Sequence, residues 1–148
     1  MPKQVYNLPI TGIASFAKYP ICTNLDELDA DVCVMGIPYD MGAPYLTGTK
    51  FGPRRIREVS CHYGRGDAGF WDPERLTQYL EAPVKVVDAG DVDMHPMDFH
   101  ESFDNVTEAV RKIISKGAIP VMMGGDHSVT IPTARALDMY DDLCIVQF

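Results

Sequence analysis

The sequence predicts an α/β fold built on a mainly parallel sheet. Four short apolar runs recur along the chain, and longer segments with glycines or helical periodicity separate them. Strands that are apolar on both faces are typical of a parallel sheet covered by helices. The alternation of strand and crossover favours right-handed βαβ units. The four expected strands span residues 31–37, 84–87, 118–123 and 143–148.

One domain is expected, because 148 residues, 46% of them hydrophobic, are enough for one ordinary core. Residues 1–30 are irregular and are interpreted as a covering arm; their turn-forming residues are Pro9, Gly12 and Pro20. Residues 31–148 hold the βαβ units.

A long glycine-rich loop follows the first strand and leads into a helix, which is expected to start near Pro53, a residue suited to a first helical turn. Long loops at the carboxyl edge of a sheet often carry function. The loop does not match a phosphate-binding loop, in which lysine directly follows glycine, because Thr49 separates Gly48 from Lys50. Three arginines of the helix are interpreted as a solvated face: Arg54, Arg55 and Arg57.

Residues 61–83 are expected to form a loop with a short helix over residues 73–79. The second strand then runs into a polar segment with a candidate metal-binding pattern. Residues two apart in an extended chain share a face, so Asp91, Asp93 and His95 could converge on a divalent ion. The alternative is that they solvate the strand end and its turn.

Apolar residues at steps of three and four predict an amphipathic helix over residues 98–116, which Gly117 ends. The third strand follows. Beyond it, Ser128 or Thr130 is expected to cap a helix that runs to about Tyr140, before the fourth buried strand.

The main candidate site is the sequence GGDHS, which directly follows the third strand. Gly124 and Gly125 allow a tight turn, so Asp126, His127 and Ser128 are expected to project from the carboxyl edge of the sheet. Such a turn suits a metal ligand at His127. The alternative is a structural turn in which His127 only bonds a neighbouring backbone group.

Composition excludes several classes of protein. A net charge of -8 opposes binding to nucleic acid or to an anionic membrane surface. No apolar run reaches the roughly 20 residues that span a bilayer, and the N-terminus lacks a signal-peptide pattern, which predicts a cytoplasmic protein. The four cysteines show no CxxC spacing, so neither a disulfide framework nor a zinc knuckle is expected.

Three motifs in order make the chain resemble the ureohydrolases, the arginase and agmatinase family, and especially its agmatinase-like branch. They are GIPYDMG...FGPRRIRE at residues 36–58, DAGDV at 88–92 and GGDHS at 124–128. The resemblance implies an arginase-like three-layer α/β/α fold. It also implies a binuclear manganese centre that hydrolyses a guanidino compound, such as agmatine, to urea and an amine.

The resemblance carries the metal-ligand role over to His127. Asp126, Ser128, Gly124 and Gly125 would hold the ligand and the turn in place. Full-length members usually form homo-oligomers.

Departures from the family pattern limit this expectation. The family's DAHxD and later DxD motifs do not occur, and one histidine cannot hold two ions. Because natural domains seldom stop on an apolar strand, we expect the chain to be the N-terminal part of a catalytic domain, truncated after about four strands and inactive alone. Leu46-Thr47-Gly48 replaces the Arg-Pro-Gly usual in agmatinases, which leaves the guanidino substrate open. The alternative function is an inactive binding or assembly module that uses an open sheet edge.

Overall fold

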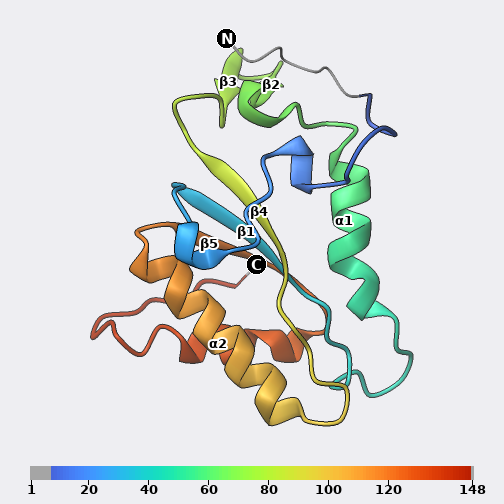
Figure 1. Cartoon of the computed structure of the whole chain (residues 1–148), viewed down its shortest axis with the longest axis vertical. Helices are drawn as coiled ribbons and strands as arrows, with labels where there is room; N and C mark the ends of the chain where they lie inside the picture. Colours follow the sequence, from blue (N-terminus) through green and yellow to red (C-terminus); the bar gives the residue numbers. More distant parts are fainter. Residues whose placement is uncertain (1–7, 148) are drawn as a thin grey trace.

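A three-stranded parallel sheet forms the centre of the molecule (Figure 1). This computed structural model describes residues 8–147, so the first seven residues of the arm and Phe148 lie outside the described part. The strands are β1 (Val32–Ile37), β4 (Val86–Asp91) and β5 (Ile119–Gly124), in the order β4-β1-β5. Both neighbouring pairs are parallel, which confirms the predicted kind of sheet.

Helices pack against both faces of this sheet. Alternate residues of β1, from Cys33 to Ile37, pack against α2 (Phe99–Ser115), whose buried residues include Val110. The other face of β1 carries Val34, which packs in a second cluster of buried residues with Tyr19 of the N-terminal arm, Val86 and Met123. Here α1 (Gly52–Ser60) and the arm cover the sheet. The three-layer α/β/α arrangement is therefore confirmed.

Local signals place α1 and α2 where the sequence predicts them. Pro53 lies in the first turn of α1 and is buried against the sheet. The Asp98 carboxylate accepts hydrogen bonds from the His100 and Glu101 amides and so caps α2. The N-terminal arm lies along β4, with Ile21 forming a parallel bridge to Asp88. No helix among residues 8–147 combines the length and the apolar character needed to cross a membrane.

The second sheet strand lies further along the chain than predicted, at residues 86–91 in place of 84–87. Asp88 and Asp91 belong to the strand because β1 pairs with them, Val34 opposite Asp88 and Gly36 opposite Asp91. A register shift between these pairs accommodates Gly90, whose φ is +79°.

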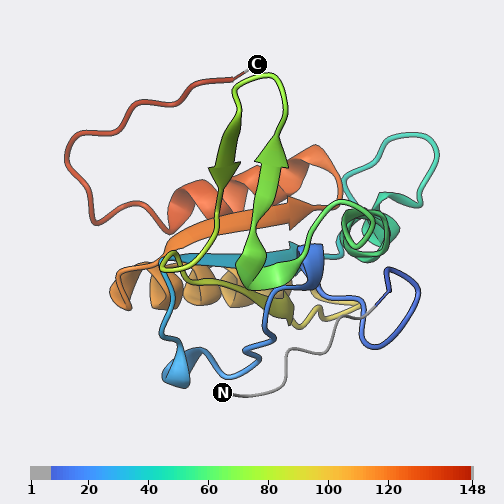
Figure 2. The ribbon, with the colours of Figure 1, turned by 90° about the horizontal axis from the view of Figure 1, so that it is seen from above.

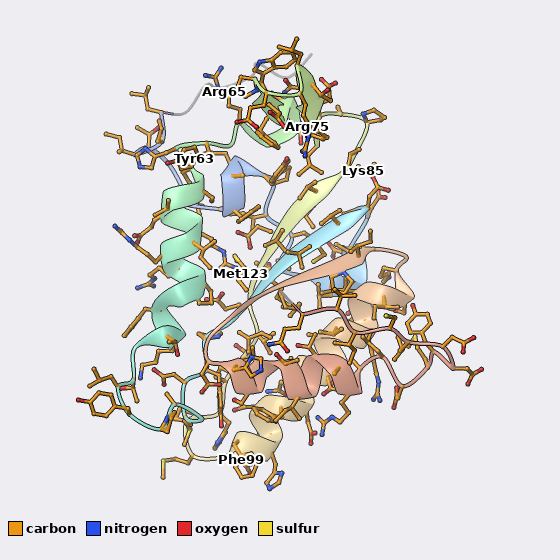
Figure 3. The ribbon with its side chains drawn as sticks, turned by 180° about the vertical axis from the view of Figure 1, so that it is seen from behind. Tyr63, Arg65, Arg75, Lys85, Phe99 and Met123 are labelled. Carbon is orange, nitrogen blue, oxygen red and sulfur yellow. The ribbon has the colours of Figure 1, made fainter. Side chains whose placement is uncertain are left out.

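The helix predicted over residues 73–79 is wrong. This segment forms an antiparallel hairpin of β2 (Phe70–Asp72) and β3 (Thr77–Tyr79). The Asp72 carboxylate accepts hydrogen bonds from the Glu74 and Arg75 amides, which closes a turn in place of a helix. Figure 3 shows Arg75 on this hairpin, at the opposite end of the molecule from Phe99.

The helix predicted after GGDHS is shorter than expected. A 3-10 turn, η5 (His127–Val129), leads into α3 (Thr130–Arg135), and turns follow it. The cap is Asp126, since its carboxylate accepts from the Ser128 amide, whereas Ser128 and Thr130 lie within the helical turns.

The fourth buried strand is also wrong within the described residues. Residues 143–147 form no sheet pairing, and Ile145 is 81% exposed. Ile21 covers part of β4 at one edge of the sheet. The other edge is β5, which pairs only with β1 among the described residues. Pro120 weakens further pairing there: the Ile119 amide bonds inward to Asp31, so the Pro120 nitrogen faces the outer edge and carries no N–H.

Candidate active site

The GGDHS turn lies at the carboxyl edge of the sheet, directly after β5. In Figure 2 the arrowheads of β1 and β5 point to the side where α1 and the loop before it lie. Backbone contacts make this turn tight. A Cβ on Gly125 would lie 2.2 Å from the Tyr39 carbonyl oxygen and 2.7 Å from that of Ile37. Only glycine therefore lets the turn approach the end of β1 this closely.

Asp126 holds the turn together through its backbone and its side chain. Its amide donates to the Tyr39 carbonyl (2.8 Å), and its carboxylate accepts from both the amide and the hydroxyl of Ser128. The same carboxylate accepts the Gly42 amide at 2.7 Å. Burial, and then the charge of Asp126, raise the pKa of the Tyr39 hydroxyl. Asp126 and Ser128 thus sit where they can fix the turn that carries His127.

His127 is the first residue of η5 and is exposed at this edge. Its imidazole is therefore accessible to a ligand or metal ion. Two surface hollows lie elsewhere and do not include it. One, of about 310 Å³, lies between the arm, α1 and β4; the other, of about 470 Å³, lies between β4 and α2.

Close contacts bring two of the sequence motifs together at this edge. A Cβ on Gly42 would lie 2.9 Å from Asp126 Oδ2, and one on Gly52 would lie 2.8 Å from the Gly124 carbonyl oxygen. The loop after β1 therefore contacts the GGDHS turn twice, once near the start of the loop and once near the end of the loop. Sequence spacing did not reveal this contact, because 84 residues separate Gly42 from Asp126.

Asp91, Asp93 and His95 do not form the metal site that their spacing suggests. Asp91 Oδ1 is 2.6 Å from the Arg57 guanidinium, whereas His95 lies 3.8 Å from the carboxylate of Glu101. Among residues 8–147, no three or more histidine, cysteine, aspartate or glutamate side chains gather as a metal site.

The remaining motif, DAGDV at residues 88–92, contributes two carboxylates to a buried ion pair. Arg57 makes two hydrogen bonds to Asp88, Nε to Oδ2 (2.7 Å) and one terminal nitrogen to Oδ1 (3.0 Å). It also donates to Asp91 and to the Gly90 carbonyl (2.6 Å each). Asp88 is 2% exposed and accepts from the Phe16 and Gly90 amides as well.

The solvated-face prediction is thus wrong for Arg57, although Arg54 and Arg55 are exposed. One sequence signal could have shown this. Arg57 lies four residues after Pro53 and so shares the buried face of α1.

A binuclear manganese centre needs several carboxylate ligands. The carboxylate of Asp126 already accepts hydrogen bonds from Gly42 and Ser128, and no cluster of possible ligands surrounds His127. The described residues therefore do not fit a binuclear centre on their own.

The chain is similar in sequence to a known protein family and to several of its members. A model of the arginase family matches residues 30–148. Agmatinase of Bacillus subtilis is 36% identical over 124 residues, which cover 81% of this chain and 39% of that protein.

Solved structures agree in fold. Proclavaminate amidino hydrolase from Streptomyces clavuligerus is 30% identical with a TM-score of 0.73, covering 88% of this chain and 41% of that one. Formiminoglutamase of Trypanosoma cruzi, solved with Mn2+2, is 25% identical with a TM-score of 0.62, covering 76% and 38%. The chain spans 33% to 41% of the length of the curated relatives it matches.

Proposed function

Because the chain belongs to the arginase family, we propose that it is part of a hydrolase that cleaves a guanidino compound to urea and an amine. The observation that carries this proposal is the GGDHS turn, which presents an exposed His127 at the carboxyl edge of a parallel sheet. Ligands bind at this edge in α/β folds. A small guanidino molecule is the proposed partner.

We propose His127 as one metal ligand, with manganese as the metal. The Mn2+2 of the Trypanosoma cruzi formiminoglutamase structure supports this choice of ion. Asp126 accepts hydrogen bonds from Ser128 and from the Gly42 amide, so Asp126 and Ser128 would keep the imidazole of His127 at the edge of the sheet. Gly124 and Gly125 would let this turn lie against the end of β1 and the start of α1.

The 148 residues alone are proposed not to release urea. A binuclear site needs more ligands than one histidine, and the described residues supply no further cluster. The substrate is proposed to be agmatine-like, as the likeness to Bacillus subtilis agmatinase supports.

The experiment compares the 148-residue chain with the product of the complete reading frame. Each is incubated with manganese and agmatine, and urea is measured. We expect urea from the complete product only. His127→Ala should lower its kcat/KM by at least about 100-fold, because even groups that merely support a metal ligand account for about 10- to 100-fold. His62→Ala is the matched control, since His62 is also exposed and follows α1.

Two results would contradict the proposal. One is urea release by the 148-residue chain at the rate of the complete product, which would remove the idea of a partial site. The other is full activity in the His127→Ala variant, which would remove the ligand role.

A further inference from the structure

Asp40 is a buried carboxylate that the proposed ligand set does not use. It lies three residues after β1, at the start of the loop that leads to α1, and is 5% exposed. A buried acid next to a candidate site needs partners for its charge. Its partners come from the far end of the same loop.

Asp40 joins the two ends of this loop. Its Oδ2 accepts the Gly48 amide at 2.7 Å, and its Oδ1 lies 3.4 Å from Lys50 Nζ. The hydrogen bond from Gly48 is the main reason why the pKa of Asp40 lies below its usual value, and Lys50 lowers it further. Asp40 therefore stays charged near neutral pH and can hold both partners.

The segment beside Asp40 is bonded to the GGDHS turn. The Tyr39 carbonyl accepts the Asp126 amide at 2.8 Å, and the Gly42 amide donates to Asp126 Oδ2 at 2.7 Å. At the other end of the loop, Gly52 approaches the Gly124 carbonyl closely. Both ends of the loop therefore contact the GGDHS turn, so the loop and the turn form a closed ring.

The middle of the loop is not held by burial. Residues 44–47 are all exposed, and Tyr45 is 87% exposed. Within this ring Asp40 supplies the side-chain contacts that tie residue 48 back to residue 40. Loss of the carboxylate should therefore free residues 41–49 while the sheet stays intact.

We propose that Asp40 is a positioning residue that ties together the two ends of the loop of residues 41–49. The closed loop then keeps Gly42 bonded to Asp126, the residue before His127. This role rests on the proposed function for its relevance to hydrolysis, although this tie, the Asp40 latch, is itself a property of the 148-residue chain.

Hydrogen exchange measured by mass spectrometry on the metal-free 148-residue chain tests the latch. In Asp40→Ala, the Gly48 amide should exchange roughly tenfold faster and raise the exchange of peptides within residues 41–49, because its hydrogen bond to the charged carboxylate is lost. Exchange in β1 and α2 should not change. Asp40→Asn keeps an acceptor for Gly48 but loses the charge that faces Lys50, so its effect should be smaller. Asp93→Ala, an exposed acid at the same sheet edge, is the matched control.

A second readout reports on the histidine itself. Diethyl pyrocarbonate should modify His127 faster in Asp40→Ala than in the unaltered chain, with His62, His95 and His100 as internal references. Unchanged exchange in residues 41–49, or an increase spread evenly over the chain, would overturn the proposal. If Asp40→Ala does not fold, Asp40→Asn decides: a smaller increase confined to residues 41–49 supports the proposal, and no increase there overturns it. Neither readout involves urea, so the latch can fail while the proposed function holds, and the reverse.

Discussion

Replacement of Asp88 by alanine should destabilise the chain more than any substitution of an exposed ion pair. Asp88 is 2% exposed and accepts hydrogen bonds from Arg57, from the Phe16 amide and from the Gly90 amide. It thereby joins α1, β4 and the N-terminal arm. Alanine removes the acceptor and leaves these donors without it.

The structure sets the size of the effect. Breaking a buried ion pair by removing one partner costs about 3–5 kcal/mol. Arg57 keeps Asp91 and the Gly90 carbonyl at 2.6 Å, so its charge is not left alone, which favours the lower end of that range. We expect a loss of about 3 kcal/mol. Domains of this kind are stable by about 5–15 kcal/mol, so the loss is a large share of the total.

Urea unfolding followed by circular dichroism measures this loss. Asp29→Ala is the control, because Asp29 pairs with Lys85 at 2.6 Å but the two side chains are 82% and 56% exposed. An exposed pair contributes at most about 1 kcal/mol. Asp88→Asn, which keeps one acceptor, should fall between the two variants.

A double-mutant cycle with Arg57→Met tests the pairing itself. The two substitutions together should cost less than the sum of each alone, by at least about 1 kcal/mol, because the Arg57–Asp88 interaction is lost in each single variant and is therefore counted twice in the sum. A loss below about 1 kcal/mol in Asp88→Ala, or strict additivity in the cycle, would refute the reasoning.

Two further predictions concern the turn and the acid limit of stability. Gly125→Ala should lower the free energy of unfolding by about 2 kcal/mol or more, since its Cβ would meet the backbone oxygen of Tyr39 at 2.2 Å; an unchanged urea midpoint would contradict the tight turn. The pKa values of Asp40 and Asp98 are lowered, mainly by the amides of Gly48 and Glu101 respectively. Their stabilisation is therefore complete above about pH 4, the range of free aspartate, and is lost as pH falls through the lower folded-state values. The urea concentration at the unfolding midpoint should therefore be lower at pH 3 than at pH 5. This decrease should be smaller in an Asp40→Asn, Asp98→Asn double variant; an equal decrease would contradict this assignment.

Short-range signals allowed the sequence to predict much of the fold. Apolar runs predicted all three strands of the sheet, and apolar residues at steps of three and four over residues 98–116 predicted α2. Such features depend on residues a few positions apart. The resemblance drawn from three motifs is confirmed by the match to the arginase family.

The errors arose where a distant partner or a competing turn decided the outcome. The Asp72 turn replaced a helix by a hairpin, and residues 143–147 did not pair with the outer edge of β5, where Pro120 offers no N–H. Arg57 was assigned to solvent because the sequence alone did not show that Asp88, 31 residues away, would lie beside it.

The sequence by itself determined the elements of the sheet, the family and the motif that carries His127. Only the tertiary structure decided which loops meet that turn. Gly42 reaches Asp126 because β1 and β5 are neighbours in register. Asp91 pairs with Arg57 and not with a metal ion because α1 packs against the face of the sheet beside β4. The physical reason is that hydrogen bonds and ion pairs of this kind depend on how parallel strands bring remote segments to one edge, which no local pattern records.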